Sequence, residues 1–194
     1  VDYRPGDVKY EDMNGDGELA WDSETLDDPG DKTIIGNNTP RYNFGLTLGG
    51  EYKNFDLQIF LQGTLKRDYA VGGPQFWGFT SQWDVPYEAS LDYWTEDNPD
   101  AYFPAPDWNK WINRETSTRY LQNAAYCRVK NITLGYSLPK SWLSKVGISK
   151  LRVYIQGENL LTFTKLHDAF DPETLNNLTY PITKKISVGL NLTL

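Results

Sequence analysis

The last eleven residues, from Lys184 to Leu194, place the strictest limit on how this chain can fold. Apolar side chains alternate one by one with small or polar ones. Because successive side chains of a strand point to opposite faces, the segment predicts a strand with one apolar and one polar face. In a soluble sheet such a strand would be an aggregation-prone edge, whereas in an outer-membrane barrel one face meets lipid and the other the lumen. The alternating residues are Ile186, Ser187, Val188, Gly189, Leu190, Asn191, Leu192, Thr193 and Leu194.

Four further segments carry the same alternation or a β-rich apolar run, and all five predict antiparallel strands. In the first of them Tyr42, Phe44 and Leu46 share one face, whereas Asn43 and Gly45 share the other. The fold class that follows is all-β. The predicted strands are residues 41–52, 55–64, 125–138, 150–163 and 183–194.

The composition excludes membrane helices but is compatible with a barrel. Hydrophobic residues make up 39% of the chain, the mean hydropathy is -0.58, and no run approaches the roughly 20 apolar residues of a membrane helix. A barrel strand needs only about 9 to 11 residues with every second one apolar, so an average does not detect it. The net charge of -7 argues against nucleic acid as a partner, because phosphate binding needs clustered Lys and Arg.

The chain offers few groups for catalysis. Cys127 and His167 are the only residues of their types, so hydrolase triads and zinc sites lack most of their usual members. Asp168, Asp171 and Glu173 follow His167, but Asp-Pro turns and a solvated acidic surface account for them. We therefore predict that the protein is not an enzyme.

The connections between the predicted strands alternate in length, and this alternation predicts an orientation. Outer-membrane barrels have short periplasmic turns and long external loops, and their last strand ends in the periplasm. Counting back from the end assigns 53–54 and 139–149 to the periplasm, where one helical turn is expected to place Trp142, Leu143 and Val146 against the barrel rim. It assigns three long segments to the extracellular side: residues 1–40, 65–124 and 164–182.

One part of the pattern conflicts with the alternation. Arg128 and Lys130 fall on the same parity as Ile132 and Leu134. Either a β-bulge near Lys130 shifts the phase of the strand, or the strand projects beyond the bilayer and its outer end is wet. We favour the projection.

Five strands are too few to close a barrel, for which about eight are the minimum. The chain would then be part of a larger protein, and its start at Val1 without a methionine or signal peptide is typical of a processed protein or a fragment. A soluble β-sandwich is the alternative, because it would bury the apolar strand faces against each other without a missing partner.

An acidic loop near the beginning of the chain predicts a calcium site. Calcium loops take oxygen ligands at positions 1, 3 and 5, a glycine at 6 and a carbonyl at 7. The chain matches this half of the motif, but position 12 is Ser23 rather than Glu, so Asp22 or another nearby carboxylate would complete the shell. The alternative is an acidic turn held by Asx hydrogen bonds alone. The candidate ligands of a structural Ca2+ are Asp12, Asn14, Asp16, Glu18 and Asp22.

The segment 65–124 is dense in aromatic residues and is the second candidate site. A loop this long needs its own packing, so its rings either form a small core or contact a substrate by stacking on sugars or clamping a peptide. Four rings follow the flexible stretch Gly72-Gly73-Pro74 and are the substrate-binding candidates. They are Phe76, Trp77, Phe79 and Trp83.

Several short sequence motifs point to a known protein family. They are PGDVKY with DMNGDG (residues 5–17), TIIGN (33–37), YKNFDL (52–57), YWTEDNP (93–99), RVKNITLGY (128–136), LP (138–139) and GENLLT (157–162). In this order the motifs resemble the SusC/RagA-type TonB-dependent transporters of the Bacteroidetes outer membrane, specifically the C-terminal part of their barrel.

The resemblance implies a barrel of about 22 strands, of which this chain would supply the last five. The plug domain, the TonB-contacting segment and the earlier strands would lie outside the chain. The resemblance also implies active import of an oligosaccharide or peptide, powered through TonB, with a SusD-like surface lipoprotein over the barrel. The alternative function is a secreted, soluble β-sandwich that binds carbohydrate and carries a calcium loop. The two differ in whether lipid or protein covers the apolar strand faces.

Overall fold

The computed structural model describes residues 3–19, 25–144, 147–175, 180 and 182–194. The chain divides into two compact units. The sheet unit comprises Asn38–Asp68 and Asn123–Leu194, and the loop unit comprises Val1–Asn37 and Tyr69–Gln122. Each unit therefore combines two stretches that are distant in the sequence.

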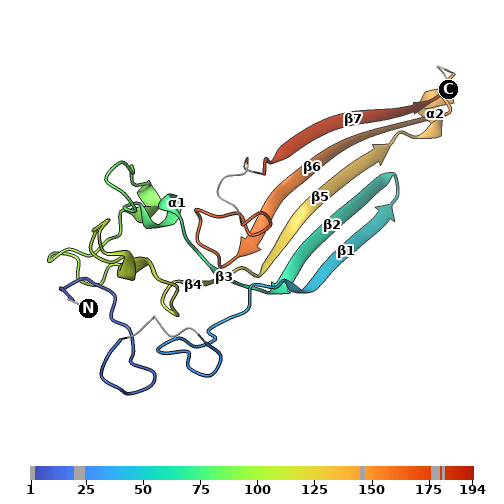
Figure 1. Ribbon diagram of the computed structural model, residues 1–194. Coiled ribbons are helices and arrows are strands. Elements are labelled where there is room, and N and C mark those ends of the chain that lie inside the picture. The colour runs from blue at the N-terminus through green and yellow to red at the C-terminus, as the bar shows by residue number, and fades with distance from the viewer. Residues whose placement is uncertain (1–2, 20–24, 145–146, 176–179, 181) are drawn as a thin grey trace. The chain divides into compact units, whose positions relative to one another are not determined.

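One five-stranded antiparallel sheet, in the order β1-β2-β5-β6-β7, forms the body of the sheet unit (Figure 1). This confirms the all-β antiparallel fold class. Every predicted strand is present, and its ends agree with the observed bounds within two residues. The strands are β1 Arg41–Tyr52, β2 Phe55–Lys66, β5 Tyr126–Ser137, β6 Lys150–Thr164 and β7 Lys185–Thr193.

Short connections join neighbouring strands at one end of the sheet. β1 and β2 are linked by the two-residue turn Lys53-Asn54, and Lys53 has a φ of 55°, as tight hairpins that match the strand twist require. The connection between β5 and β6 contains the expected helical turn, α2 (Lys140–Leu143), in which Leu143 is buried and Trp142 is exposed. The expected contact of Val146 lies outside the described residues.

A β-bulge at Lys130 removes the conflict in the alternation, so the interpretation as a projecting strand is wrong. Val129 and Asn131 pair with two consecutive residues of β2, which leaves Lys130 as an extra residue in β5. The pairing with β6 shifts at the same place. Because an extra residue reverses the phase of a strand, Arg128 lies on the same face as Asn131 and opposite to Ile132.

Aromatic rings form the core of the loop unit. Phe76 is fully buried, and Trp77, Phe103 and Tyr120 are each less than one tenth exposed. Ring centroids lie 5.1 Å apart for Phe76 and Phe103 and 4.7 Å apart for Trp77 and Tyr120, in the edge-to-face arrangement that aromatic pairs favour. The short elements of this unit are α1 Pro74–Trp77, η1 Glu88–Ser90 and η2 Trp111–Arg114.

The remaining elements are too small to cover the large sheet. β3 (Asp68–Ala70) and β4 (Leu121–Asn123) pair as the only other sheet among the described residues. Two strands of three residues cannot bury one face of a five-stranded sheet, so the described strands do not supply the second sheet that a sandwich needs. None of the helices in the described ranges has the length and apolar character needed to cross a membrane.

Candidate functional site

The two faces of the five-stranded sheet have opposite chemistry. On one face the cross-strand neighbours are apolar in strand after strand, as in the row formed by Leu57, Leu134, Ile155 and Val188. These side chains are open to the surroundings: Val188 is 75% exposed and Ile155 is 47% exposed. We call this the apolar face. Its large side chains include Leu46, Leu48, Tyr52, Phe55, Leu57, Ile59, Leu61, Val129, Ile132, Leu134, Tyr136, Val153, Ile155, Leu161, Phe163, Ile186, Val188, Leu190 and Leu192.

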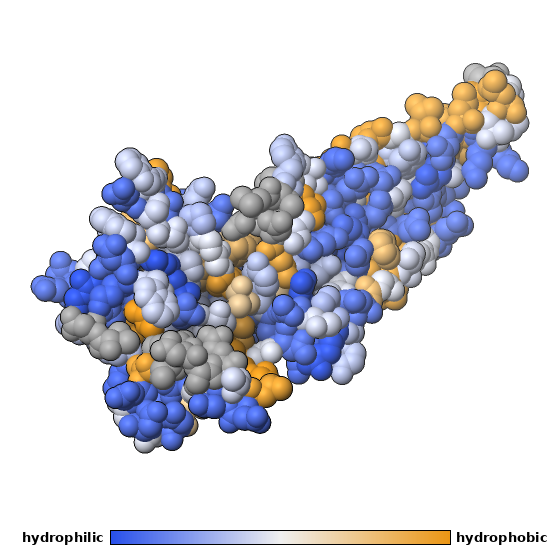
Figure 2. All heavy atoms as spheres, viewed as in Figure 1, coloured by the Kyte–Doolittle hydropathy of each residue, from blue (hydrophilic) through white to orange (hydrophobic). Residues whose placement is uncertain are grey.

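The opposite face, which we call the polar face, is lined by amides, hydroxyls and charges. Figure 2 shows this side of the sheet as mostly hydrophilic. Phe60 is an apolar ring among its members, and it packs over Gly45. Polar residues of this face are Asn43, Thr47, Asp56, Gln58, Gln62, Thr64, Arg128, Asn131, Thr133, Arg152, Gln156, Glu158, Ser187 and Asn191.

An ion pair crosses three strands of the polar face near the short turns. The guanidinium of Arg152 on β6 binds Asp56 on β2 with both carboxylate oxygens, at 2.8 Å from Nε and 2.5 Å from the terminal nitrogen. Gly135 of β5 lies between them, and a Cβ there would collide with both side chains. The guanidinium also lies 5.0 Å from the ring centroid of Tyr154, which itself packs over Gly189. The glycines thus provide the space in which a bidentate pair can form.

A second charged cluster holds part of the segment after β6. Arg128 is 3% exposed, and its two terminal nitrogens each lie 2.5 Å from a carboxylate, one of Asp171 and one of Glu173. Its Nε donates to Thr162 at 2.8 Å, and Lys130 also reaches Glu173 at 3.0 Å. We call these residues the Arg128 cluster. Asp171 and Glu173 are therefore partners of buried and half-buried cations, and the expectation of a merely solvated acidic surface is wrong for these two residues.

Exposed apolar side chains on one face and a hydrated, charged surface on the other are what a sheet needs to separate lipid from water. Soluble monomers rarely leave contiguous apolar patches larger than a few hundred Å2 uncovered. Barrel strands of outer membranes alternate in this way along their whole length. The sheet therefore has the chemistry of a barrel wall.

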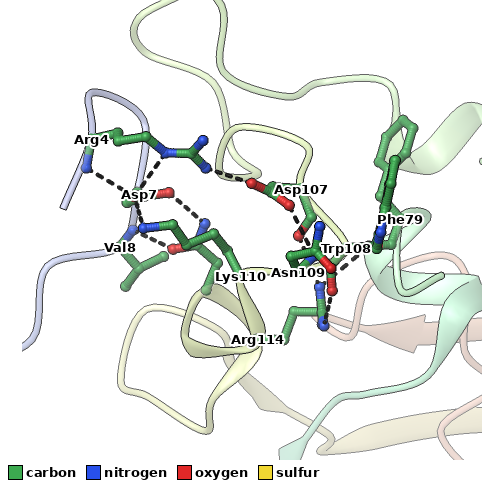
Figure 3. Close-up of polar contacts among 10 residues, drawn as sticks. Arg4, Asp7, Val8, Phe79, Asp107, Trp108, Asn109, Lys110 and Arg114 are labelled. Carbon is green, nitrogen blue, oxygen red and sulfur yellow. Dashed lines mark hydrogen bonds and ion pairs between the residues drawn. The ribbon is translucent and has the colours of Figure 1, made fainter. Parts of the chain in front are cut away.

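In the loop unit, a polar network ties the beginning of the chain to residues more than one hundred positions later (Figure 3). The carboxylate of Asp7 accepts hydrogen bonds from the amide of Arg4 at 2.9 Å and from Asn113 at 2.8 Å, and lies 3.5 Å from the Lys110 ammonium. The Arg4 guanidinium binds Asp107 at 2.6 Å.

This network shifts the acidity of its carboxylates. Burial alone would raise the pKa of Asp7, whose side chain is 1% exposed, but the hydrogen bonds from Asn113 and Arg4 and the charge of Lys110 hold that pKa below its usual range. The hydrogen bond from the Arg4 guanidinium, followed by that from the Asn109 amide, lowers the pKa of Asp107. Both carboxylates are thus held in the charged form.

A cavity of about 620 Å3 lies in the same unit. It is lined by residues 6–11, by Trp94 and by the segment 117–119. Small-molecule sites commonly fall between about 300 and 1,000 Å3. The loop unit therefore has room for a ligand of that size.

The acidic loop at residues 12–18 is held by its own side chains. Asp12 accepts the amides of Gly15 at 2.6 Å and Gly17 at 2.8 Å, while Asn14 and Asp16 accept the amides two residues further on. These are the Asx hydrogen bonds of the alternative interpretation. No group of three His, Cys, Asp or Glu side chains suited to a metal occurs among the described residues, and the candidate ligand Asp22 lies outside them. Calcium binding by Asp12, Asn14, Asp16, Glu18 and Asp22 stays a prediction.

The four aromatic candidates are not equivalent. Phe76 and Trp77 are buried in the aromatic core, as expected if the rings of this long loop form a small core of their own. Contact of these two rings with a substrate stays a prediction. Phe79 is half-buried, with its ring centroid 5.7 Å from that of Tyr93.

Trp83 is the candidate that the structure leaves accessible, at 83% exposed. It sits in a turn closed by Asp84, whose carboxylate accepts hydrogen bonds from the Thr80 hydroxyl and from the amides of Thr80 and Ser81. The hydrogen bond from the Thr80 hydroxyl lowers the pKa of Asp84, and burial acts in the opposite direction. Trp83 is therefore presented on a defined turn, and its role in substrate contact stays a prediction.

No family model matches the chain. Among curated proteins, it is 29% identical to TonB-dependent receptor P3 of Formosa agariphila over 98% of its own length and 19% of the relative. It is 27% identical to TonB-dependent receptor SusC of Bacteroides thetaiotaomicron, over 97% of the chain and 18% of the relative.

Solved structures show a similarity to the same kind of protein. The structure of the RagAB peptide transporter is similar with a TM-score of 0.61 and 28% identity, over 82% of this chain and 18% of that one. A second structure, of the RagAB peptide importer in the open-open state, gives a TM-score of 0.62 and 29% identity, over 83% of this chain. The chain matches the SusC/RagA-type TonB-dependent receptors. It spans less than one fifth of the length of these SusC/RagA-type relatives. Their descriptions are those of receptors and transporters, in agreement with the prediction that the chain is not an enzyme.

Proposed function

We propose that the chain forms five consecutive strands of the transmembrane barrel of a TonB-dependent importer in a bacterial outer membrane. The observation that carries the proposal is the apolar face, which five strands keep continuous and which no described element covers. The similarity to SusC and RagAB supports it. In this proposal the polar face lines the lumen, and residues 1–40, 65–124 and 164–182 are extracellular loops.

The partners and substrate belong to the proposal as well. TonB supplies energy through a part of the receptor outside this chain, and a SusD-like lipoprotein covers the extracellular opening. The substrate is a peptide or an oligosaccharide, and the description of RagAB as a peptide transporter favours the peptide. The exposed Trp83 and the cavity lined by Trp94 are two of the places in the loop unit where such a substrate would find an aromatic ring.

Two neighbouring positions on β7 test which face meets lipid. In the full-length receptor with Cys127→Ser, S187C lies on the polar face and V188C on the apolar face. A water-soluble maleimide added to permeabilised outer membranes should modify S187C and leave V188C unmodified until detergent is added. Equal labelling of both positions in membranes would contradict the barrel.

Orientation and substrate need separate measurements. On intact cells the same reagent should reach W83C but reach N54C only after permeabilisation. Uptake of labelled oligopeptides and oligosaccharides, compared between cells with and without the receptor and its TonB, identifies the substrate class. Uptake that continues without TonB would contradict active import.

A further inference from the structure

A groove on the apolar face lies next to the β1–β2 turn. It has a volume of about 510 Å3, and its apolar walls are Leu48, Tyr52, Phe55, Leu57 and Ile59. It exists because the apolar row of β1 is interrupted by Gly50, where a Cβ would meet no atom within 4 Å. The groove is thus an open channel among side chains of the membrane-facing side.

Lys53 brings a positive charge next to one wall of the groove. The ammonium of Lys53, in the turn, lies 5.3 Å from the centroid of the Tyr52 ring, which belongs to the apolar face. Glu51 and Asp56 also border the groove, but they alternate onto the polar face, where Asp56 is bound by Arg152. Lys53 therefore places a cation beside a ring that lines the groove.

Aromatic residues mark this end of the sheet as the level of the lipid headgroups. Tyr52 is 72% exposed and Trp142 is 64% exposed, and the amide of Ser137 at the end of β5 donates to Asn54 in the turn. Trp and Tyr collect at membrane interfaces because they have an apolar body and a polar tip. A phosphate at this level would lie beside the Lys53 ammonium.

The length of the groove fits one leaflet. A strand rises about 3.4 Å per residue, so the five steps from Leu48 to Lys53 cover roughly 17 Å along β1. Half of a hydrocarbon core of about 30 Å is roughly 15 Å. Because strands are tilted, the groove reaches from the interface to near the middle of the bilayer.

We propose that this groove holds one acyl chain of a phospholipid whose phosphate pairs with Lys53. The inference rests on the proposed function, since it needs the apolar face to lie in a membrane. The occupant is a phospholipid because the walls are apolar, a lysine lies beside the wall residue Tyr52, and both lie where the tails and headgroups of a bilayer meet.

The test uses the full-length receptor in mild detergent, incubated with phosphatidylglycerol. Native mass spectrometry then counts the lipid molecules that stay bound to the receptor. Gly50→Leu fills the groove at a position with open space, and Lys53→Asn removes the charge while suiting the positive φ of the turn. Val188→Leu enlarges an exposed residue of the same face outside the groove and is the matched control.

We expect the parent and Val188→Leu to retain one phosphatidylglycerol, Gly50→Leu to lose it, and Lys53→Asn to bind it about two- to fivefold more weakly. Equal retention by Gly50→Leu and the parent would overturn the proposal. So would retention of diacylglycerol as strongly as phosphatidylglycerol, because the phosphate would then have no role.

Substrate uptake by cells should be unchanged in these variants. Normal uptake without lipid retention would refute only the groove, whereas a receptor absent from the outer membrane would refute the proposed function.

Discussion

Removing the negative charges of the Arg128 cluster should destabilise the segment after β6 more than removing the positive charge of Arg128. Arg128 is 3% exposed, whereas the side chains of Asp171 and Glu173 are 28% and 22% exposed. In Asp171→Asn with Glu173→Gln, a buried guanidinium loses its counter-charges. In Arg128→Met, two partly hydrated carboxylates lose a partner, and Glu173 keeps Lys130.

The two changes differ in expected size. Leaving a buried charge unpaired costs about 3–5 kcal/mol, whereas losing hydrogen bonds to a charged group that can rehydrate costs about 1.5–3 kcal/mol. One factor of ten in an opening equilibrium corresponds to about 1.4 kcal/mol. The double variant should therefore open the segment 166–175 on the order of 100-fold or more, and Arg128→Met about ten- to one-hundredfold.

Hydrogen exchange in the full-length receptor measures this opening. The amides of Phe170 and Leu175 report on it, because they donate to the carbonyl oxygens of His167 and Asp171 at 3.0 and 2.8 Å. Asp168→Asn, which neutralises an exposed carboxylate of the same segment, should leave both amides protected. If Arg128→Met opened the segment more than the double variant, burial of Arg128 would not be the dominant cost and the reasoning would be refuted.

Four further predictions concern other parts of the molecule. Phe76→Ala should destabilise the loop unit by about 3–5 kcal/mol, whereas Trp83→Ala should change its stability by less than about 0.5 kcal/mol, both measured by hydrogen exchange. Gly135→Ala should break the ion pair beneath it and lower stability by about 1–3 kcal/mol in urea unfolding of the receptor in detergent. Because the folded pKa of Asp7 lies below its unfolded value of 3.8, its stabilising contribution should be complete above pH 3.8 and disappear as the pH falls through the folded value, which amide protection against pH would show. Calcium should protect residues 12–18 from proteolysis, and Asp12→Asn should abolish that protection.

Each of these four has a control. Gly50→Ala adds the same methyl group as Gly135→Ala where nothing lies within 4 Å, so equal loss would contradict the role of the ion pair. Asp7→Asn should flatten the acid dependence of the Val8 amide, which donates to Asn113. Equal loss in Phe76→Ala and Trp83→Ala would contradict the assignment of the aromatic core. Protection of the loop by magnesium as strongly as by calcium would contradict a calcium site.

The strands could be predicted because alternation is a local property. In β7 the alternation alone assigns each residue to a face of the sheet. The turn at Lys53 is short enough to fix the pairing of β1 with β2. The bulge at Lys130 could not be located in this way, because an extra residue is defined only by its partner strands. The parity conflict at Arg128 is the signal of the bulge in the sequence, and it marks a buried cation rather than a solvent-exposed strand end.

The candidate sites were less accessible to sequence reasoning. The carboxylate partners of Arg128 lie more than forty positions away, in a segment whose acidic residues resemble any hydrated turn. Phe76 and Trp83 follow the same glycines, and nothing in their spacing tells a core ring from an exposed one. Tertiary packing decided both cases, placing one ring among Trp77, Phe103 and Tyr120 and leaving the other on a turn.

The division of the loop unit into two distant stretches has a consequence for the order of assembly. The hydrogen bond from the Val8 amide to Asn113 joins residues 105 positions apart, and the intervening chain contains the whole β1–β2 hairpin. Closing such a long loop costs chain entropy. Once Arg41 pairs with Lys66 in the hairpin, the residues between them no longer add to the effective length of the loop, and the entropic cost falls. The aromatic core should therefore form after the first hairpin, so a substitution that slows formation of the turn at Lys53 would also delay the folding of the loop unit.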